Sequence, residues 1–449
     1  MSTDTIVALA TAPGRAGIGV IRLSGPKAFA IAAQLGAANL TPRLAKFCHF
    51  QIHGEAVDSG LALAFPGPAS FTGEDVVELH AHGSPVTLKQ LIRCSLDLGA
   101  RLANPGEFSQ RAFLNARIDL AQAEAIADLI SSGSESAARA AMRSLDGVFS
   151  RRIDQLAEQI IELRKYVEAA IDFAEEEIDF LGDGKIASQL QQLLARLEET
   201  LTEGKKGQKL LQGLNIVILG EPNAGKSSLL NHFAGDDRAI VTDVAGTTRD
   251  TLTETIDLGG LPISITDTAG LNAKPDPVEK IGIERALQSA RKADLVLVLF
   301  DSNNRSVEQT RSLLQLHQLD RASADILLVA NKTDLSTQTT GWQQDDKGRW
   351  LGISVKQREG LEELAQALHE FAGLQGEAPA FSARDRHLVA LQQARSHLQQ
   401  AIELLANQQA GELVAEELRL GHLALQEITG SFSSDNLLGE IFSSFCVGK

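Results

Sequence analysis

LNIVILGEPNAGKS, at residues 214–227, is the stretch that decides the fold of this chain. Its apolar run at 216–219 predicts a buried parallel strand. The next eight residues match the pattern G-x-x-x-x-G-K-[ST], and Leu229-Leu230 begin an apolar helix face. A strand, a glycine-rich loop and a helix in that order predict backbone N–H groups that cradle a phosphate.

This loop supplies the first predicted nucleotide contacts. We expect Lys226 to reach the β- and γ-phosphates and the Ser227 hydroxyl to ligate Mg²⁺. The residues of the loop that we expect to bind the nucleotide are Asn223, Ala224, Gly225, Lys226, Ser227 and Ser228. Glycine-rich turns also form for structural reasons alone, so the assignment depends on further motifs.

One such motif is expected on the phosphate side of the nucleotide, together with a loop upstream of it. Asp267-Thr268-Ala269-Gly270 follows the alternating run 261–265, so an Asp ends a predicted strand above Mg²⁺, and Gly270 is free to turn toward a γ-phosphate. Upstream of it, Thr248 is the expected second Mg²⁺ ligand. The other residues of this upstream loop that we expect at the nucleotide are Thr242, Asp243, Val244, Ala245, Gly246 and Thr247.

Two more motifs are expected on the base side. Asn331-Lys332-Thr333-Asp334 follows the apolar run 326–330, and Ser354-Val355-Lys356 follows 351–353. The Asp334 carboxylate is suited to accept two N–H bonds from the edge of guanine, whereas adenine offers no such pair. Ser354-Val355-Lys356 is expected to close over the base. Four motifs in this order, each after a predicted strand, predict a GTP hydrolase rather than an ATPase.

Composition sets limits on the rest of the molecule. The chain has 449 residues, enough for two or three domains, and a net charge of −16, which argues against nucleic-acid binding through basicity alone. No apolar run of about 18 residues and no secretory leader is evident, so we expect a cytoplasmic protein without a membrane partner. Three cysteines form no CxxC pair and predict no disulfide framework.

The pattern along the chain predicts an α/β plus α protein in four segments. These are an α/β domain at 1–118, a first helical half at 119–213, a GTPase domain at 214–374 and a second helical half at 375–449. We expect strands at 6–9, 18–23, 61–65 and within 71–80, and helices at 120–141, 148–180 and 381–428. Lys205–Lys209 and 373–380 are interpreted as linkers, and the acidic block 175–179 as a solvated helix face.

Four stretches together resemble one family along the whole chain. They are FTGEDVVELHAHG at 71–83, GEPNAGKSSLLN at 220–231, DVAGTTRD at 243–250 and IFSSFCVGK at 441–449. Together they resemble the MnmE (TrmE) family of tRNA modification GTPases. The phosphate-binding set is shared by many GTPases, whereas the first and last stretches make the resemblance specific.

The resemblance implies a fold and an activity. The fold is an N-terminal folate-binding α/β domain that dimerises, a central helical domain and an inserted Ras-like P-loop GTPase domain. The activity is that of a K⁺-stimulated GTPase that works with the flavoprotein MnmG. The pair adds a carboxymethylaminomethyl or aminomethyl group to C5 of wobble uridine 34 in certain tRNAs. The implied cofactor is a 5-formyl- or 5,10-methylene-tetrahydrofolate, with FAD entering only through the partner. The implied assemblies are a homodimer and a heterotetramer with MnmG.

The resemblance also assigns the hydrolytic residues. Ras-like enzymes place a water-orienting Gln where this chain has Leu271. Glu279 matches the family's catalytic glutamate, which positions the attacking water; the alternative is an exposed helix residue. Asn223 matches the family's K⁺ ligand, together with the carbonyls of Thr242, Val244 and Thr247; the alternative is a turn residue. Asn272 stands where the family often has Arg, and Arg249 is interpreted as a solvated loop residue.

The folate site is assigned in the same way. Arg22, Glu78 and Arg117 match the family's folate residues, with Lys449 reaching in from the far end of the chain. A carboxylate suits the N–H groups of a pterin, and a cation suits the glutamyl tail. An ordinary surface pair is the alternative for Arg22 and Glu78. Cys446 is expected to act as a thiolate in methylene transfer, the alternative being a buried spare thiol.

A second class of function stays open from the residues alone. A ribosome-assembly GTPase would also carry the nucleotide motifs, with outer domains that bind RNA and perform no chemistry. Its expected mark is a basic RNA-binding appendage. The net charge of −16 and the terminal Cys-Val-Gly-Lys argue against that reading. Cys48 and Cys94 are expected to be structural.

Overall fold

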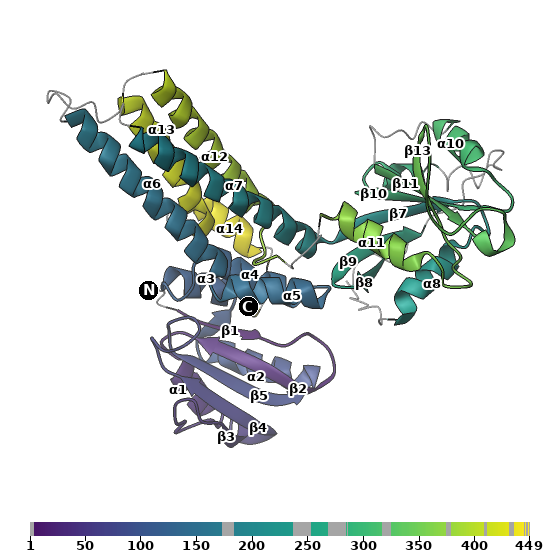
Figure 1. Cartoon of the computed structure of the whole chain (residues 1–449). Coiled ribbons are helices and arrows are strands. Elements are labelled where there is room, and N and C mark those ends of the chain that lie inside the picture. The colour runs from purple at the N-terminus through teal and green to yellow at the C-terminus, as the bar shows by residue number, and fades with distance from the viewer. Residues whose placement is uncertain are drawn as a thin grey trace. The chain divides into compact units, whose positions relative to one another are not determined.

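The structure is a computed structural model of the whole chain (Figure 1). It describes residues 4–172, 184–236, 253–267, 284, 286–316, 325–373, 379–407, 411–430, 435–443, 445 and 448. The chain forms two compact units, one of residues 1–127, 145–194 and 393–449 and the other of residues 128–144 and 195–392. Among the helices of the described residues, none is both long and apolar enough to cross a membrane.

The first unit begins with a six-stranded sheet. Its strands are β1 (Thr5–Leu9), β2 (Ala16–Ser24), β3 (Lys46–Ile52), β4 (Glu55–Phe65), β5 (Val76–Gly83) and β6 (Ala100–Leu102), in the order β3-β4-β5-β2-β1-β6. Only the β1–β6 pair is parallel. Two helices, α1 (Ala28–Gln34) and α2 (Pro85–Asp97), share one buried core with the strands. Cys48 and Cys94 belong to this core as free thiols, which fits their expected structural role.

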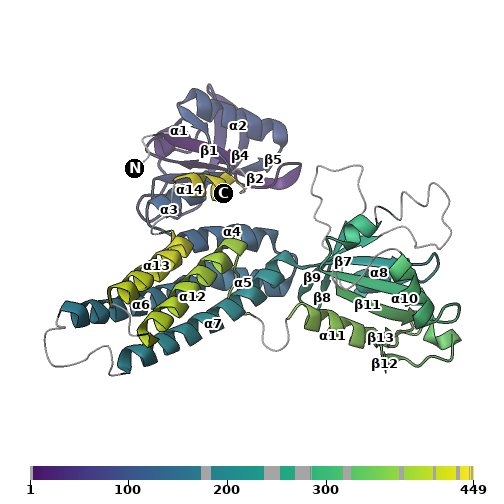
Figure 2. The same cartoon turned by 90° about the horizontal axis from the view of Figure 1, so that it is seen from above.

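Helices make up the rest of the first unit. Helices α3 (Glu107–Leu114), α6 (Val148–Asp172), α13 (Gly411–Thr429) and α14 (Asp435–Ser443) lie wholly within it, and α4 (Leu120–Ser131) lies in it up to residue 127. Helices α6 and α13 run side by side in both views (Figures 1 and 2). Helix α14 buries Leu438, Ile441 and Phe442 in one cluster with Leu120 at the start of α4. The end of the chain is therefore packed against the helices that follow the first sheet.

The expected linker at Lys205–Lys209 is wrong, because these residues lie inside α7 (Lys185–Gln212). Glycine is needed at position 207 because a Cβ there would lie 2.2 Å from the Phe381 carbonyl oxygen.

The expected helix at 120–141 is two helices, α4 and α5 (Glu135–Leu145). Between them, the Ser134 hydroxyl accepts a hydrogen bond from the Ala137 N–H at 3.1 Å. The expected helix at 381–428 likewise divides into α12 (Asp385–Ala406) and α13.

The second unit contains a seven-stranded sheet. Its strands are β7 (Leu214–Gly220), β8 (Thr253–Leu258), β9 (Leu261–Asp267), β10 (Leu295–Asp301), β11 (Asp325–Asn331), β12 (Gly341–Asp345) and β13 (Gly348–Gly352), in the order β12-β13-β11-β10-β7-β9-β8. The five inner strands are parallel, and β12 and β8 pair antiparallel at the two edges. The strand expected in the quoted stretch is therefore central.

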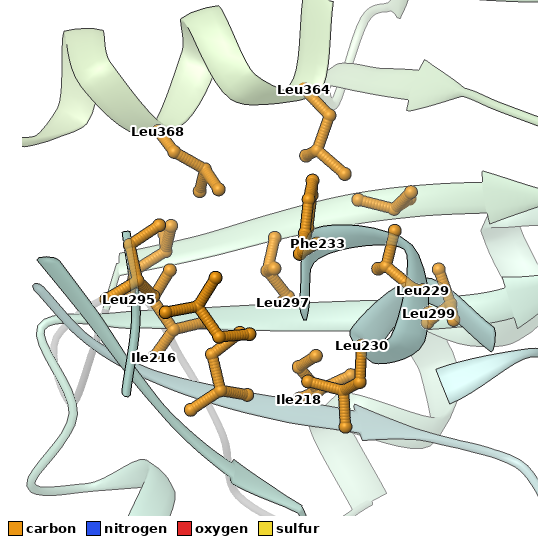
Figure 3. Close-up of a cluster of buried hydrophobic side chains, with 14 of the residues drawn as sticks. Ile216, Ile218, Leu229, Leu230, Phe233, Leu295, Leu297, Leu299, Leu364 and Leu368 are labelled. Carbon is orange, nitrogen blue, oxygen red and sulfur yellow. The ribbon is translucent and has the colours of Figure 1, made fainter. Parts of the chain in front are cut away.

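Both faces of this sheet are covered. Side chains that alternate along β7 enter different cores: Ile216 and Ile218 pack with α8 (Lys226–Asp236) and α11 (Leu361–Phe371), and Val217 packs with α10 (Val307–Leu316). Figure 3 shows the first core, with the labelled leucines of α8 and α11 directed toward the strands. Burial on both faces explains why β7, β10 and β11 contain unbroken apolar runs.

Candidate GTP-binding site

The quoted stretch places its loop at the carboxyl edge of the central strand. Strand β7 lies between β10 and β9, and its parallel neighbours leave the sheet at the same edge. The carboxyl ends of β7, β9, β10, β11 and β13 therefore meet at one edge of the sheet. In open parallel sheets, ligands bind in the crevice outside these carboxyl ends.

The loop has the backbone conformation of a phosphate cradle. Gly225 has φ +99°, and a Cβ there would lie 2.3 Å from Asn331 Nδ2, so this position requires glycine. Asn223 also has a positive φ, of 65°. The Lys226 ammonium donates to the carbonyl oxygens of Gly220 at 3.0 Å and Glu221 at 3.1 Å. The lysine is thus held at the loop, where a phosphate oxygen would exchange with these carbonyls.

The base-recognition residues converge from β11 and the segment after β13. Ser354 donates its hydroxyl to Asp334 Oδ1 at 2.8 Å, which fixes the carboxylate that we expect to bind guanine. Asn331 is buried and joins the two sides of the site. Its amide donates to the Ala224 carbonyl at 2.8 Å and its Oδ1 accepts the Val355 N–H at 3.2 Å. The phosphate loop and the base motifs are therefore one hydrogen-bonded assembly.

A cavity of about 680 Å³ lies against this assembly. It is lined by Gly225, Ser228, Asn231, His232, Asn331, Lys332, Asp334, Leu335, Val355, Lys356 and Arg358. Sequence reasoning missed Asn231, His232, Leu335 and Arg358. The first two had a signal, because Ser228, Asn231 and His232 are spaced i, i+3 and i+4 and share one face of α8.

Several predicted site residues lie outside the described part of the chain. They are Thr242, Asp243, Val244, Ala245, Gly246, Thr247, Thr248, Thr268, Ala269, Gly270, Glu279, Cys446 and Lys449. Strand β9 ends at Asp267, as expected, at the same edge of the sheet as the phosphate loop. Ser227 is exposed in the first turn of α8.

A second polar site lies on the sheet of the first unit. Arg22 on β2 and Glu78 on β5 are directly opposite in the antiparallel register. Arg22 Nε donates to Glu78 Oε1 at 2.9 Å, and its Nη1 donates to the Gly448 carbonyl at 3.4 Å. The Arg22 guanidinium also lies 5.6 Å from the centre of the Phe108 ring. The structure therefore joins the predicted Arg–Glu pair to the segment before Lys449.

The arginine–glutamate pair has neighbours that sequence reasoning missed. His80 Nε2 lies 3.3 Å from Glu78 Oε2, and the two residues share a face of β5 because they are two apart. Arg117 is exposed after α3, and its Cγ and Cδ would each lie 3.4 Å from a Cβ at Gly73. The structure thus places Arg117 beside the 71–83 stretch, although within the described part of the chain Arg117 forms no hydrogen bond to Arg22 or Glu78.

The 71–83 stretch also has a structural role. Arg111 on α3, whose side chain is 5% exposed, pairs with Glu74 at 2.9 Å and with Glu107 at 2.9 Å. Ser24 donates its hydroxyl to Glu74 at 2.7 Å. Burial raises the pKa of Glu107, but hydrogen bonds from Arg101, the Asn104 N–H and Arg111 outweigh it, so that pKa lies below its usual range. This network ties α3 to the sheet.

The fold and the site in the second unit define the class of the protein. A phosphate cradle on a central parallel strand, with a carboxylate held by Ser354 for the edge of guanine, is the site of a P-loop GTPase.

Comparison with known proteins then gives the family. A family profile described as GTP-binding protein TrmE N-terminus matches residues 5–117, and one described as MnmE helical domain matches residues 120–446. The tRNA modification GTPase MnmE of Legionella pneumophila (strain Paris) is 53% identical over 100% of both chains. That of Stutzerimonas stutzeri (strain A1501) is 52% identical over 99% of both. The chain belongs to the MnmE family.

A search of solved structures adds little to this. A structure of Aquifex aeolicus Era bound to GDP and aluminium fluoride is 22% identical over 41% of this chain and 66% of its own, with a TM-score of 0.28. A score of this size supports no argument about the chain beyond the motifs described above.

Proposed function

We propose that this chain is a K⁺-stimulated, dimerising GTPase that acts with the flavoprotein MnmG on tRNA. The product is a carboxymethylaminomethyl or aminomethyl group on C5 of wobble uridine 34. The one-carbon unit comes from a tetrahydrofolate. The observation that carries the proposal is the Arg22–Glu78–Gly448 site, because hydrolysis of GTP has no use for it. Full-length similarity to proteins named tRNA modification GTPase MnmE supports the same function.

The residues around the nucleotide fit Mg²⁺ and GTP. Lys226 already satisfies its ammonium with two loop carbonyls, which a phosphate oxygen replaces on binding. Ser227 supplies the hydroxyl for Mg²⁺, and Asp334 supplies the acceptors for the guanine N–H groups. Asn223 is exposed with its backbone in the left-handed region, which leaves its amide oxygen available for K⁺. Glu279 holds the attacking water.

The residues on the first sheet fit a folate. Glu78 has a side chain that is 19% exposed, and Arg22 beside it is 24% exposed, so the pair is half-open to a ligand. The carboxylate accepts N–H groups of a pterin, and Arg22, Arg117 and Lys449 provide cations for the glutamyl tail. The bound folate supplies the one-carbon unit, and Cys446 provides a thiolate for its transfer.

Mass spectrometry of tRNA nucleosides tests the proposal. Cells that lack this protein should lose aminomethyl-type groups on wobble uridine, and the wild-type gene should restore them. Cys446→Ser should fail to restore them while its purified protein keeps GTP turnover. A matched control is Cys94→Ser, which changes a buried thiol of the first core and should restore modification. An unchanged nucleoside profile in the deletion would overturn the proposal and favour a ribosome-assembly GTPase, for which ribosome profiles are the next measurement.

A further inference from the structure

The loop between β10 and α10 belongs to none of the nucleotide motifs. It reads Asp301-Ser302-Asn303-Asn304-Arg305. Strand β10 lies between β11, which carries the base motif, and β7, which carries the phosphate loop. The strand order therefore places this loop between the two halves of the nucleotide site.

On the base side, Asp301 is bound to Lys332. Its Oδ2 lies 2.8 Å from Lys332 Nζ, and the Asp301 side chain is only 10% exposed. The backbone of Lys332 has φ 65°, an uncommon conformation for a residue with a side chain. The Ser302 N–H donates to the Asn331 carbonyl at 2.9 Å. The loop thus holds both residues at the start of the N-K-T-D motif.

The Asp301 carboxylate also orders its own loop. Its Oδ1 accepts the Asn303 N–H at 3.0 Å, and its Oδ2 accepts from the Asn304 amide at 3.0 Å. The Arg305 N–H donates to the Asp301 carbonyl at 3.0 Å. The Asp301 carbonyl and carboxylate therefore both hold the backbone of the loop that leads to Arg305.

On the phosphate side, Arg305 forms an ion pair with Glu221. Glu221 is the second residue of the phosphate loop, and its carbonyl accepts from Lys226. A free carboxylate in this loop would repel a nucleotide polyphosphate and compete for the lysine. Side-chain exposures of 20% for Arg305 and 26% for Glu221 leave the pair partly shielded from water.

We propose that the 301–305 loop is a positioning element for the guanine nucleotide. Asp301 holds Lys332 in place for the base side, and Arg305 neutralises the carboxylate of Glu221 for the phosphate side. Both residues act through another residue of the site. The inference deepens the GTP-binding part of the proposed function and rests on it.

Nucleotide affinities of the full-length protein test the Arg305 half. Fluorescent GMP, GDP and the non-hydrolysable β,γ-imido analogue of GTP are titrated onto wild type, Arg305→Ala and Arg305→Lys. Arg305→Ala should lower the affinity for the triphosphate analogue by about three- to tenfold. The affinity for GDP should fall by less and that for GMP least, because the repulsion from Glu221 grows with the charge of the phosphates. The loss should shrink at high salt. Arg305→Lys keeps the charge and should retain most of the affinity.

A compensating substitution separates this role from a merely structural one. Glu221→Gln alone should bind the triphosphate analogue at least as well as wild type, and Arg305→Ala with Glu221→Gln should recover the affinity that Arg305→Ala loses. The Arg305 assignment would be overturned if the affinity losses of the two single variants added up in the double variant. It would also be overturned if Arg305→Ala lowered the affinity for all three nucleotides equally. Because Glu221→Gln leaves Arg305 in place, it tests the proposal even where Arg305→Ala folds poorly.

Asp301→Asn tests the base side. This substitution should lower the affinities for GMP, GDP and the triphosphate analogue by a similar factor, because it acts on Lys332 and not on the phosphate side of the site. Lys347→Ala is the matched control, because its exposed ion pair with Glu308 lies in the same domain, away from the cavity lining. Unchanged affinities in Asp301→Asn would overturn this half. Wild type that binds none of the three nucleotides would instead overturn the GTP-binding function itself.

Discussion

Asp334 is the side chain that we propose selects the guanine base. Ser354 donates to one carboxylate oxygen at 2.8 Å, which fixes the carboxylate while leaving acceptor capacity on both oxygens. Guanine presents two adjacent N–H donors on one edge, so two acceptors are required. The Ser354 backbone is itself fixed by a pair of hydrogen bonds with Glu359 at 3.0 and 3.1 Å. Selectivity therefore depends on a prearranged acceptor.

We expect Asp334→Asn to exchange guanine for xanthine. The amide replaces one acceptor with a donor, which leaves a guanine N–H unpaired but matches the second carbonyl of xanthine. Affinity for GDP should fall roughly ten- to hundredfold, the cost of an unpaired buried polar group. Competition titrations with GDP and xanthosine diphosphate measure this. Asp346→Asn, at an exposed turn, is the control and should bind GDP normally.

Asn223 carries the expected dependence on potassium. Replacing KCl with NaCl should slow GTP turnover severalfold at equal ionic strength, because Na⁺ is too small for a site built for K⁺. In Asn223→Ala the two salts should give the same low rate, while GDP affinity changes little. Steady-state phosphate release measures the rates. Equal wild-type rates in both salts would remove the potassium role from Asn223.

Helix α3 is attached to the first sheet through buried charges. Arg111, Glu74 and Glu107 are nearly buried, and such ion pairs gain little over apolar packing, although breaking one leaves a buried charge. Helix α3 also carries Phe108, which lies beside the Arg22 guanidinium. The network therefore holds helix α3 on the sheet and also positions Phe108 beside the Arg22–Glu78 pair.

We expect Arg111→Met to destabilise the first sheet by about 3–5 kcal/mol, since two carboxylates lose a buried partner. Arg419→Ala, which breaks a solvent-exposed pair with Glu416, should leave the stability of the chain almost unchanged. Hydrogen exchange of β1 and α3 amides in the full chain, measured by mass spectrometry, compares the two. Equal protection in Arg111→Met and wild type would contradict the assignment.

The same network predicts a dependence on pH. The pKa of Glu107 is lowered in the folded chain, so its contribution is present above the pKa of the unfolded state, about 4.3, and is lost as pH falls through the lower folded value. Glu107→Gln should therefore be less stable than wild type at pH 7, and the gap should narrow in acid. Denaturant midpoints at several pH values measure this; a constant gap would count against it.

The elements also show what the sequence could predict. Among the inner strands of the second sheet, runs within β7, β9 and β11 and at the end of β13 were predicted as strands, whereas β10 was missed although all of its residues are buried. Strand β3 was missed, because Lys46, Cys48 and His49 dilute its alternation, and β6 was missed because three residues carry no period. Nucleotide motifs that are contiguous in sequence were predicted, and the structure brings the described ones together. Contacts between distant residues, such as Asp301 with Lys332, leave no local signal.

At the scale of the whole molecule, each unit carries its own site. The nucleotide motifs that the structure describes lie in residues 195–392, whereas Arg22, Glu78 and Gly448 lie in the other unit. Gly448 is buried, with φ +101°, and a Cβ there would lie 2.2 Å from the Leu9 carbonyl oxygen. The last described residue therefore packs directly on the first strand.

Gly448→Ala should separate the two sites functionally. The added methyl group has no space, so the backbone at residue 448 should move away from Arg22. The affinity for 5-formyl-tetrahydrofolate should then fall by roughly tenfold or more, because of backbone strain and the lost contact with Arg22. GTP turnover should be unchanged. Calorimetric titration and phosphate release measure the two activities. Gly439→Ala in α14 is the control, because a Cβ there meets nothing within 4 Å. Normal folate binding in Gly448→Ala would contradict the placement.

The hydrogen bond between Arg22 and Gly448 joins residues 426 positions apart. At about 5–20 residues per second, a ribosome needs roughly 20–85 s to pass from one to the other. The first sheet is therefore synthesised before the helices and the whole GTPase domain that follow it in the chain. A truncated product retains the nucleotide motifs but never completes the Arg22 site. The Arg22 site on β2 is thus completed only after the intervening residues up to Gly448 have been synthesised.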